Sequence, residues 1–257
     1  MRKPVRAGLR GGSRAAKLSG MQRILLLSTS AVHGSGYLEY CADAVREHLG
    51  SDVQRVLFVP YALHDREAYT ELVRGRLSAL GYEVTGLHQA QGAAAAQAAV
   101  REAQAIFVGG GNTFRLVNEL YAHGLHDVVR ERVRAGMPYM GSSAGTNVAG
   151  PTARTTNDMP ICEPPSLTTF GLVPFQINPH YVDADPSSTH MGETREQRIR
   201  EFHEMNETPV VGVREGAWLH VLGAEVTLHG EPGGRLFRRG EEPIELAAGT
   251  RLDEILS

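Results

Sequence analysis

Cysteine is scarce in this chain, and long apolar runs are absent. Only two cysteines, Cys41 and Cys162, occur among 257 residues. They are too few for a disulfide framework and lie in no metal-ligand spacing, so we expect packing roles and a reducing, cytoplasmic environment. No apolar run approaches the roughly 18 residues that a membrane-spanning helix requires. We therefore expect neither a metal centre nor a membrane partner.

The chain also has no excess of basic charge. Its 26 lysine and arginine residues are outnumbered by 29 aspartate and glutamate residues, giving a formal net charge of −3. A nucleic-acid partner is therefore not expected. Basic residues are enriched in residues 1–20, and the first acidic residue of the chain is Glu39. Because this segment lacks the apolar region of a secretory signal, we interpret it as a loose extension, with Met21 as the natural start.

Residues 21–257 are expected to form a single α/β domain. Hydrophobic residues make up 42% of the sequence, which is enough for one sizeable core. Apolar runs typical of buried strands cover residues 24–30, 56–60, 105–108 and 138–142, and residues 82–87 alternate like a strand. Stretches with helical spacing alternate with them, at residues 37–49, 67–80, 93–103, 112–122 and 125–135. This alternation predicts a mostly parallel sheet with helices on both faces.

The second half of the chain has a less regular pattern. Residues 150–178 predict a long ordered loop, and loops of that length in compact domains are usually functional or disordered. Further strands are expected at residues 175–180 and 209–213, with a helix after Thr194, which suits an N-cap. From residue 217 onward, hairpin glycines predict short antiparallel strands near the C-terminus.

A Gly-x-Ser-x-Gly pattern lies at Gly141, Ser143 and Gly145. A strand pattern precedes it and small residues follow, as in a nucleophile elbow, which lifts a serine hydroxyl to the end of a sheet. The glycines suit this interpretation because so tight a turn leaves little room for a Cβ atom. The alternative is a glycine-rich turn with no chemical role, since short glycine patterns also arise by chance.

A second glycine turn, residues 109–111, follows the strand at residues 105–108. It lacks the Gly-Lys-Ser/Thr ending of a nucleotide phosphate loop and the spacing of a dinucleotide-binding motif. Ligand sites of parallel sheets lie at the carboxyl ends of the strands, where this turn and Ser143 are both expected. We therefore expect the backbone amides of Gly110 and Gly111, together with that of Ala144, to form an oxyanion hole.

A serine nucleophile needs a neighbouring base. Among eleven histidines, His180 is the best candidate, because it ends the strand at residues 175–180 in a polar loop. His123, His203 and His220 lie within predicted helices or strands, where packing or surface roles are more common.

Two carboxylates compete to orient this base. Glu215 follows the strand at residues 209–213, which would place it on the same edge of the sheet as Ser143. Asp158 lies in the long loop 15 positions after Ser143. We favour Glu215 on geometry. Asp158 would give the chain order of an ordinary α/β-hydrolase, so an esterase stays open.

Five segments of the chain, in the same order, resemble the peptidase E family of aspartyl dipeptidases. They are residues 109–114, 141–145, 154–160, 177–180 and 192–200. The resemblance extends from about Met21 to near the C-terminus. It implies a sheet related to that of class I glutamine amidotransferases, which is flavodoxin-like. It further implies a serine peptidase, free of metal and cofactor, that removes N-terminal aspartate from Asp-X dipeptides.

The resemblance also implies roles for individual residues. It makes Ser143 the nucleophile, His180 the base and Glu215 the acid, with Asp158 as the other candidate for the acid. One departure is Ser142, because many relatives have tryptophan before the nucleophile. This change removes no catalytic group.

Recognition of an aspartyl side chain requires a cation. Arg195, at the start of a predicted helix, is preferred over Arg154, although either side chain could instead form a surface ion pair. Asn112, Thr113 and Asp158 are candidates to bind the amino and amide groups of the substrate.

Two other functions stay open besides the esterase. One is a cyanophycinase-like hydrolase of β-aspartyl-arginine, and the other is a catalytically silent binding protein. The only partner expected is a small peptide substrate, and a homodimer is left open.

Overall fold

The computed structural model describes residues 20–185, 187, 189 and 192–256. The extension expected at residues 1–20 therefore lies outside the described residues, apart from Gly20. The described strands are β1 (Arg23–Leu27), β2 (Arg55–Val59), β3 (Glu83–Gly86), β4 (Ala105–Val108), β5 (Tyr139–Ser142), β6 (Gln176–Pro179), β7 (Val210–Val213), β8 (Trp218–Leu222), β9 (Glu225–His229), β10 (Gly234–Phe237) and β11 (Ile244–Leu246). The described α-helices are α2 (Ala42–Leu49), α3 (Arg66–Ser78), α4 (Gly92–Glu102), α5 (Thr113–Ala122), α6 (Leu125–Arg134), α7 (Ala144–Asn147) and α8 (Arg195–Met205).

The larger sheet has seven strands in the order β3-β2-β4-β5-β1-β8-β9. The first five strands are parallel, whereas β8 and β9 are antiparallel. Successive side chains of a strand point to opposite faces, so Leu25 and Leu27 of β1 pack toward α2 and α3, whereas Ile24 and Leu26 belong to the core that includes α4, α5 and α6. The expected parallel sheet with helices on both faces is confirmed for this part of the chain.

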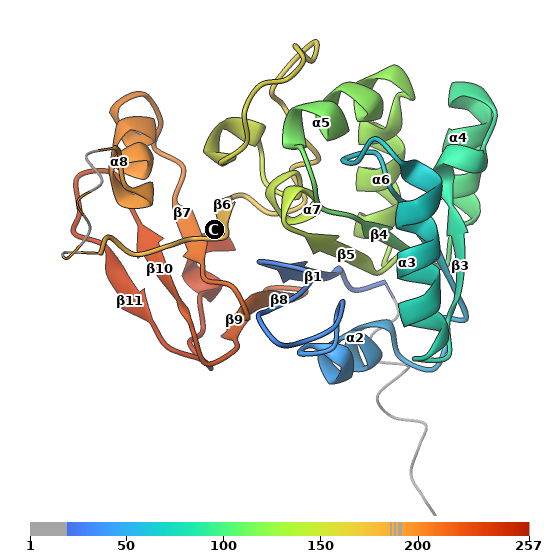
Figure 1. Ribbon diagram of the computed structural model, residues 1–257, viewed down its shortest axis with the longest axis horizontal. Coiled ribbons are helices and arrows are strands. Elements are labelled where there is room, and N and C mark those ends of the chain that lie inside the picture. Colours follow the sequence, from blue (N-terminus) through green and yellow to red (C-terminus); the bar gives the residue numbers. More distant parts are fainter. Residues whose placement is uncertain (1–19, 186, 188, 190–191, 257) are drawn as a thin grey trace, which may run out of the picture.

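A smaller sheet of four strands has the order β11-β10-β7-β6. Its strands β6 and β7 are parallel, and its other pairs are antiparallel. The expectation that the strand before Glu215 lies in the same sheet as Ser143 is therefore wrong. The physical reason is that β8 pairs along the whole of β1, so that edge of the parallel strands is closed to β6 and β7. Figure 1 shows the smaller sheet and α8 beside the larger sheet and its helices.

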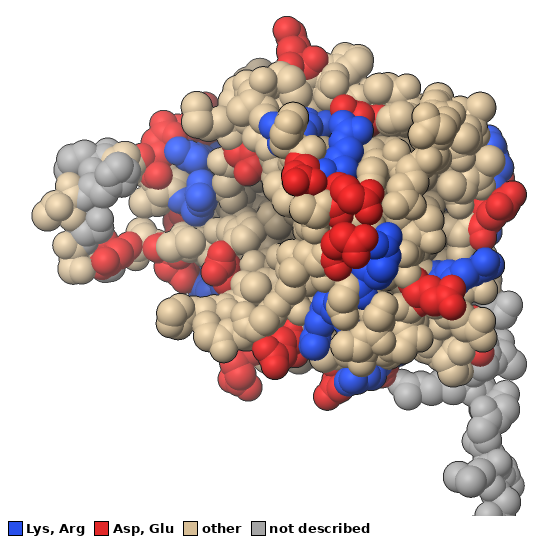
Figure 2. Space-filling view, turned by 45° about the vertical axis from the view of Figure 1, so that its right-hand side comes forward, with Lys and Arg blue, Asp and Glu red and all other residues tan. Residues whose placement is uncertain are grey.

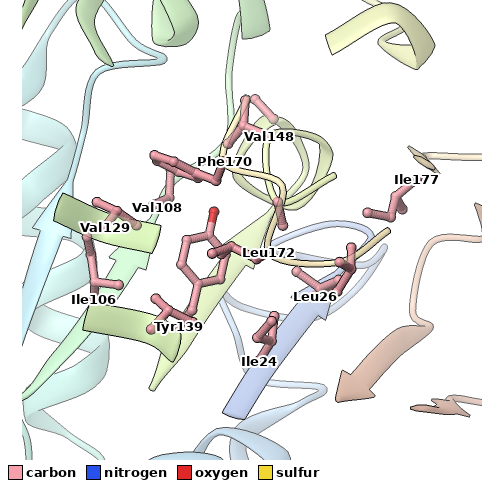
Figure 3. Close-up of a cluster of buried hydrophobic side chains, with 14 of the residues drawn as sticks. Ile24, Leu26, Ile106, Val108, Val129, Tyr139, Val148, Phe170, Leu172 and Ile177 are labelled. Atoms are coloured by element: carbon pink, nitrogen blue, oxygen red, sulfur yellow. The ribbon is translucent and has the colours of Figure 1, made fainter. Parts of the chain in front are cut away.

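One core lies under both sheets. Leu26 of β1 and Ile177 of β6 belong to the same buried cluster, as do Val211 of β7 and Leu236 of β10. Figure 3 shows Leu26 and Ile177 on neighbouring elements of this core. The carboxyl ends of strands from the two sheets are thereby held close to each other.

Local sequence signals account for some helix ends. Helix α8 begins after Thr194, whose side chain forms a capping box with Gln197, as the N-cap expectation required. Helix α2 starts at Ala42 rather than at residue 37 as expected. The preceding turn has Leu38 at φ 52°, a left-handed conformation that a helix cannot contain.

The described surface is of mixed charge. On the face shown in Figure 2, acidic and basic side chains are interspersed. Within the described residues, no helix is both long and apolar enough to cross a membrane.

Candidate active site

Ser143 lies in a sharp turn between β5 and α7. Its backbone has φ 51° and ψ −111°, a conformation that non-glycine residues rarely adopt and that costs about 1–3 kcal/mol. The turn is held by the Ser143 amide, which donates to the Leu27 carbonyl at 3.1 Å, and by the Ser143 carbonyl, which accepts from the Asn147 amide at 2.9 Å. Ser143 itself is half-buried, so its hydroxyl can be reached from outside.

Both flanking glycines are required by close backbone contacts. A Cβ atom on Gly141 would lie 2.5 Å from the Gly145 carbonyl oxygen, and one on Gly145 would overlap the Val108 carbonyl. The Tyr139 hydroxyl donates to that same Gly145 carbonyl at 2.6 Å and supports the turn from below. Figure 3 shows the Tyr139 ring upright in the core beneath α7. The strand, sharp turn and helix expected from the sequence are therefore present.

Ser143, His180 and Glu215 form a chain of hydrogen bonds. His180 Nε2 lies 2.8 Å from Ser143 Oγ, and His180 Nδ1 lies 2.5 Å from Glu215 Oε1. If Nδ1 carries the proton that Glu215 accepts, the Nε2 lone pair faces the serine hydroxyl. This geometry lets the imidazole act as a general base toward Ser143.

The three residues come from strand ends in two different sheets. His180 follows β6 and Glu215 lies two residues after β7, and these strands are parallel neighbours in the smaller sheet. Ser143 follows β5 of the larger sheet. The site therefore lies where the carboxyl ends of the two sheets meet. Its outer part is open, because the Glu215 side chain is 54% exposed.

Asp158 does not contact His180. Its Oδ2 accepts from the Thr113 amide at 2.8 Å and from the Thr113 hydroxyl at 2.6 Å, and Thr156 lies at 3.2 Å. This carboxylate therefore caps the first turn of α5, a favourable place for negative charge. The structure therefore corrects the alternative in which Asp158 orients His180. The α/β-hydrolase chain order, which required Asp158 in that role, loses its support.

Two residues expected to bind substrate also have partners within the protein. Thr113 donates to Asp158, as described above. Asn112 is the N-cap of α5, with Oδ1 accepting from the Arg115 amide at 3.1 Å and Nδ2 donating to the Met159 carbonyl at 2.9 Å. Both side chains therefore organise the loop over α5. Their expected role as substrate contacts stays a prediction.

The glycine turn lies directly against the nucleophile. A Cβ atom on Gly110 would lie 2.9 Å from Ser143 Cβ. The Gly110 amide, however, donates to the hydroxyl of buried Tyr69 at 2.8 Å, which corrects its expected role as an oxyanion donor. Among the described residues, the amides of Gly111 and Ala144 have no hydrogen-bond partner. Those two amides therefore stay the candidates for an oxyanion hole.

No sequence signal identifies Tyr69 as part of the site. Its position within helix α3 is typical of a core residue, and nothing in the sequence separates it from one. Burial raises the pKa of Tyr69, so its hydroxyl stays protonated and neutral. It also lies 3.3 Å from the Tyr37 hydroxyl. Tyr69 therefore fixes the Gly109–Gly110 peptide behind the nucleophile.

Arg195 and Arg154 are the candidate cations for the substrate's carboxylate. Neither forms an ion pair with another described residue. The neighbours of Arg195 pair instead, Arg198 with Glu193 and Arg200 with Glu196. Arg195 is half-buried, and its pKa is lowered, first by desolvation and then by the charge of Arg198, while the charge of Asp158 opposes the shift. Its guanidinium therefore lies within electrostatic range of the loop over α5. Arg154 is exposed.

Arg214, the residue before Glu215, clamps the segment that follows His180. Its guanidinium donates to Asp183 at 2.7 and 2.9 Å and to Glu245 at 2.5 and 3.0 Å. Its hydrogen bonds to Asp183 and then Glu245 raise the pKa of Arg214, and the same bonds lower the pKa of the Asp183 carboxyl. The clamp ties the chain beyond His180 to the strand that carries Glu215.

Replacement of Asp183 by asparagine is expected to lower the free energy of unfolding by less than about 1 kcal/mol at pH 7, because the carboxylate is 47% exposed. The folded pKa lies below the ordinary value of 3.8. The difference in unfolding free energy between the two proteins should therefore be complete above about pH 3.8, and it should disappear as the pH falls through the folded pKa of Asp183. Urea unfolding of both proteins at several pH values measures it. A difference that does not change with pH would contradict the assignment.

Comparison with known proteins agrees with this architecture. Residues 24–229 match Peptidase family S51. Peptidase E of Streptomyces coelicolor is 56% identical over 233 residues, covering 91% of this chain and 94% of that protein. The probable alpha-aspartyl dipeptidase of Drosophila melanogaster is 47% identical over 232 residues, covering 90% and 95%.

Two solved structures share the fold. A putative peptidase E protein from Listeria monocytogenes EGD-e has a TM-score of 0.63 at 24% identity, covering 82% of this chain and 98% of that chain. A peptidase from an acI-B1 actinobacterium has a TM-score of 0.65 at 18% identity, covering 91% and 98%. At these identities the likeness concerns the fold alone. Together with the match over residues 24–229, the relatives show that this chain belongs to peptidase family S51.

Proposed function

We propose that this protein is a serine peptidase that hydrolyses dipeptides with N-terminal aspartate, and that Ser143, His180 and Glu215 are its catalytic triad. The observation that carries the proposal is the hydrogen-bond chain from Ser143 through His180 to Glu215. The names of the relatives, peptidase E and probable alpha-aspartyl dipeptidase, support the choice of substrate.

The proposed reaction is acyl transfer. Ser143 Oγ attacks the carbonyl carbon of the N-terminal aspartyl residue while His180 Nε2 accepts the hydroxyl proton. The amides of Gly111 and Ala144 bind the resulting oxyanion, and such donors are typically worth about 3 kcal/mol each. The tetrahedral intermediate then loses the C–N bond, and His180 donates its proton to the departing amine. Water, deprotonated by His180, then attacks the carbonyl carbon of the aspartyl ester. The bond from this carbon to Ser143 Oγ breaks, aspartate is released, and His180 returns the proton to Ser143 Oγ.

Glu215 supports both stages from the far side of the imidazole. Its carboxylate accepts from Nδ1, which keeps the Nε2 lone pair directed at Ser143. It also stabilises the imidazolium that forms after proton transfer. Each of these steps uses protein groups and water.

Arg195 is the preferred partner of the substrate's aspartyl carboxylate, with Arg154 as the alternative. A half-buried guanidinium without an ion-pair partner among the described residues is available to a carboxylate ligand, and desolvation strengthens that contact. Arg154 lies in the same loop as Asp158 but is exposed, which weakens any such bond by solvent screening.

Replacement of Arg195 by methionine is therefore expected to lower kcat/KM for Asp-Leu by about 100-fold, the equivalent of a charged hydrogen bond of about 3 kcal/mol. The activity ratio of Asp-Leu to Asn-Leu should fall with it, because the cation distinguishes the two side chains. Arg154→Met is the matched control and should change that ratio less than threefold. A large fall in the ratio for Arg154→Met but not for Arg195→Met would assign the subsite to Arg154. An unchanged ratio in both variants would contradict both assignments.

A substrate panel tests the function itself. The purified protein should release aspartate from Asp-Leu and leave Leu-Asp and Asn-Leu intact. Faster cleavage of β-aspartyl-arginine than of Asp-Leu would instead indicate the cyanophycinase-like activity. Hydrolysis of simple esters without any dipeptide cleavage would indicate an esterase.

We also propose that the larger sheet is flavodoxin-like and related to the sheet of class I glutamine amidotransferases. Strands β3-β2-β4-β5 follow the order 2-1-3-4 of flavodoxin-like sheets, and β1 takes the fifth place. We further propose that residues 21–257 form one domain. The shared core under both sheets supports this, because it joins β1 and β5 to β6, β7 and β10.

A further inference from the structure

The end of β1 contacts both the nucleophile and the base. The Leu27 carbonyl accepts from the Ser143 amide at 3.1 Å and from the Thr146 hydroxyl at 2.6 Å. The next residue is Ser28, which is fully buried. Its Oγ accepts from the His180 amide at 2.9 Å. Two consecutive residues of one strand end therefore hold the backbones of Ser143 and His180.

The Ser28 hydroxyl also has a fixed orientation. It donates to the Val213 carbonyl at 2.8 Å, so its oxygen lone pairs are left to accept from His180. The Ser28 amide is itself anchored on the Ala217 carbonyl at 3.1 Å. A buried hydroxyl with both donor and acceptor used in this way is a rigid link between its two partners.

His180 needs such a link because its backbone is strained. It has φ 53°, a left-handed conformation that is uncommon for residues with a side chain. The Tyr181 amide binds the Val213 carbonyl at 3.1 Å, which holds the chain after the turn. The only hydrogen bond of the His180 amide within the described residues is the one to Ser28. Without it, the turn can relax and swing the imidazole.

The link crosses between the two sheets. Ser28 directly follows β1 of the larger sheet, and Ser143 directly follows the neighbouring strand β5. His180 follows β6 and Val213 ends β7 of the smaller sheet. The hydroxyl therefore sets the separation of the two sheets at the point where Ser143 Oγ and His180 Nε2 must stay within hydrogen-bonding distance.

We propose that Ser28 is a positioning residue, whose hydroxyl holds His180 in line with Ser143 across the junction of the two sheets. This rests on the proposed function of Ser143 and His180. A small displacement of the base lowers the reaction rate steeply, because proton transfer in the transition state requires hydrogen-bonding distance.

The test replaces Ser28 by alanine. We expect kcat for Asp-Leu to fall about 10- to 100-fold with KM changed less than threefold, since the substrate-binding groups are untouched. The matched control is Thr169→Val, which removes another buried hydroxyl, bonded to the Gly150 carbonyl at 2.6 Å. It should lose similar stability in urea unfolding yet keep kcat within threefold. Equal loss of kcat in both variants would reduce Ser28 to a structural role.

A second readout is independent of the dipeptide substrate. The rate at which phenylmethylsulfonyl fluoride labels Ser143 reports its activation by His180. We expect this rate to fall at least tenfold in Ser28→Ala and to stay within twofold in Thr169→Val. A wild-type rate in Ser28→Ala would overturn the positioning role alone. Absence of labelling in the wild type would overturn the serine mechanism and the role of Ser28 with it.

If Ser28→Ala does not fold, Ser28→Cys takes its place. A thiol keeps nearly the same size but donates and accepts more weakly. We expect a labelling rate between those of the wild type and a fully misaligned site, so a rate within twofold of the wild type would overturn the proposal.

Discussion

Replacement of Ser143 by alanine is expected to lower kcat for Asp-Leu by at least about 10⁴-fold, because it removes the nucleophile while leaving the oxyanion donors in place. Alanine keeps a Cβ atom, so the strained backbone of the turn is unchanged. The binding of Asp-Leu should therefore persist and can be measured by isothermal titration calorimetry. Release of aspartate over hours, at high enzyme concentration, measures the residual rate.

Ser142→Ala is the control for this experiment. Ser142, unlike Ser143, is fully buried, and its hydroxyl has no hydrogen-bond partner in the described part of the chain. Its replacement should change kcat less than threefold and show that shortening a serine at the end of β5 is harmless. Turnover by Ser143→Ala at more than a hundredth of the wild-type rate would contradict a serine mechanism.

The second large effect is expected for Glu215→Gln, which should lower kcat about 10³- to 10⁴-fold at neutral pH. The neutral amide stabilises the imidazolium of His180 less, and its NH₂ group can present the wrong hydrogen-bonding pattern to Nδ1. We favour the smaller loss, about 10³-fold, because the Glu215 side chain is 54% exposed. Water can therefore partly replace the carboxylate as the partner of His180. Steady-state kinetics between pH 6 and pH 9 would measure the loss.

Asp158→Asn is the matched carboxylate control. Its carboxylate binds Thr113 rather than His180, so its replacement should lower the free energy of unfolding by about 1 kcal/mol through the weakened cap of α5. We expect kcat to fall less than tenfold. If Asp158→Asn abolished acylation and Glu215→Gln did not, the assignment of the acid would be reversed.

Local sequence patterns predicted much of the fold and part of the site. Four-residue apolar runs such as 105–108 predicted buried strands, because a parallel strand covered on both faces has no polar side. The glycines around Ser143 predicted the turn, since Gly141 and Gly145 have no room for a Cβ atom. These signals are short-range, so each is complete within a few neighbouring residues.

Other features depend on which strands pair. The sequence favours Glu215 as the partner of His180 on the assumption of one sheet, yet Glu215 reaches His180 from the smaller sheet. Asp158 is close to Ser143 in sequence but binds Thr113 on α5. Gly110 has a suitable amide, but Tyr69, 41 positions earlier in the chain, occupies it. Contacts of this range leave no local pattern in the sequence.

The sequence by itself determined the alternating strands and helices and the strained serine turn, because these follow from side-chain burial, backbone sterics and spacing over a few residues. Only the tertiary structure decided that β8 closes the edge of the parallel strands, that β6 and β7 form a second sheet, and that Ser28 joins the two sheets at His180. Those outcomes depend on the competition among strands for pairing partners and on hydrogen bonds between residues more than 150 positions apart. A base must be held within about 3 Å of its nucleophile, and such a distance is set by the packing of the whole core.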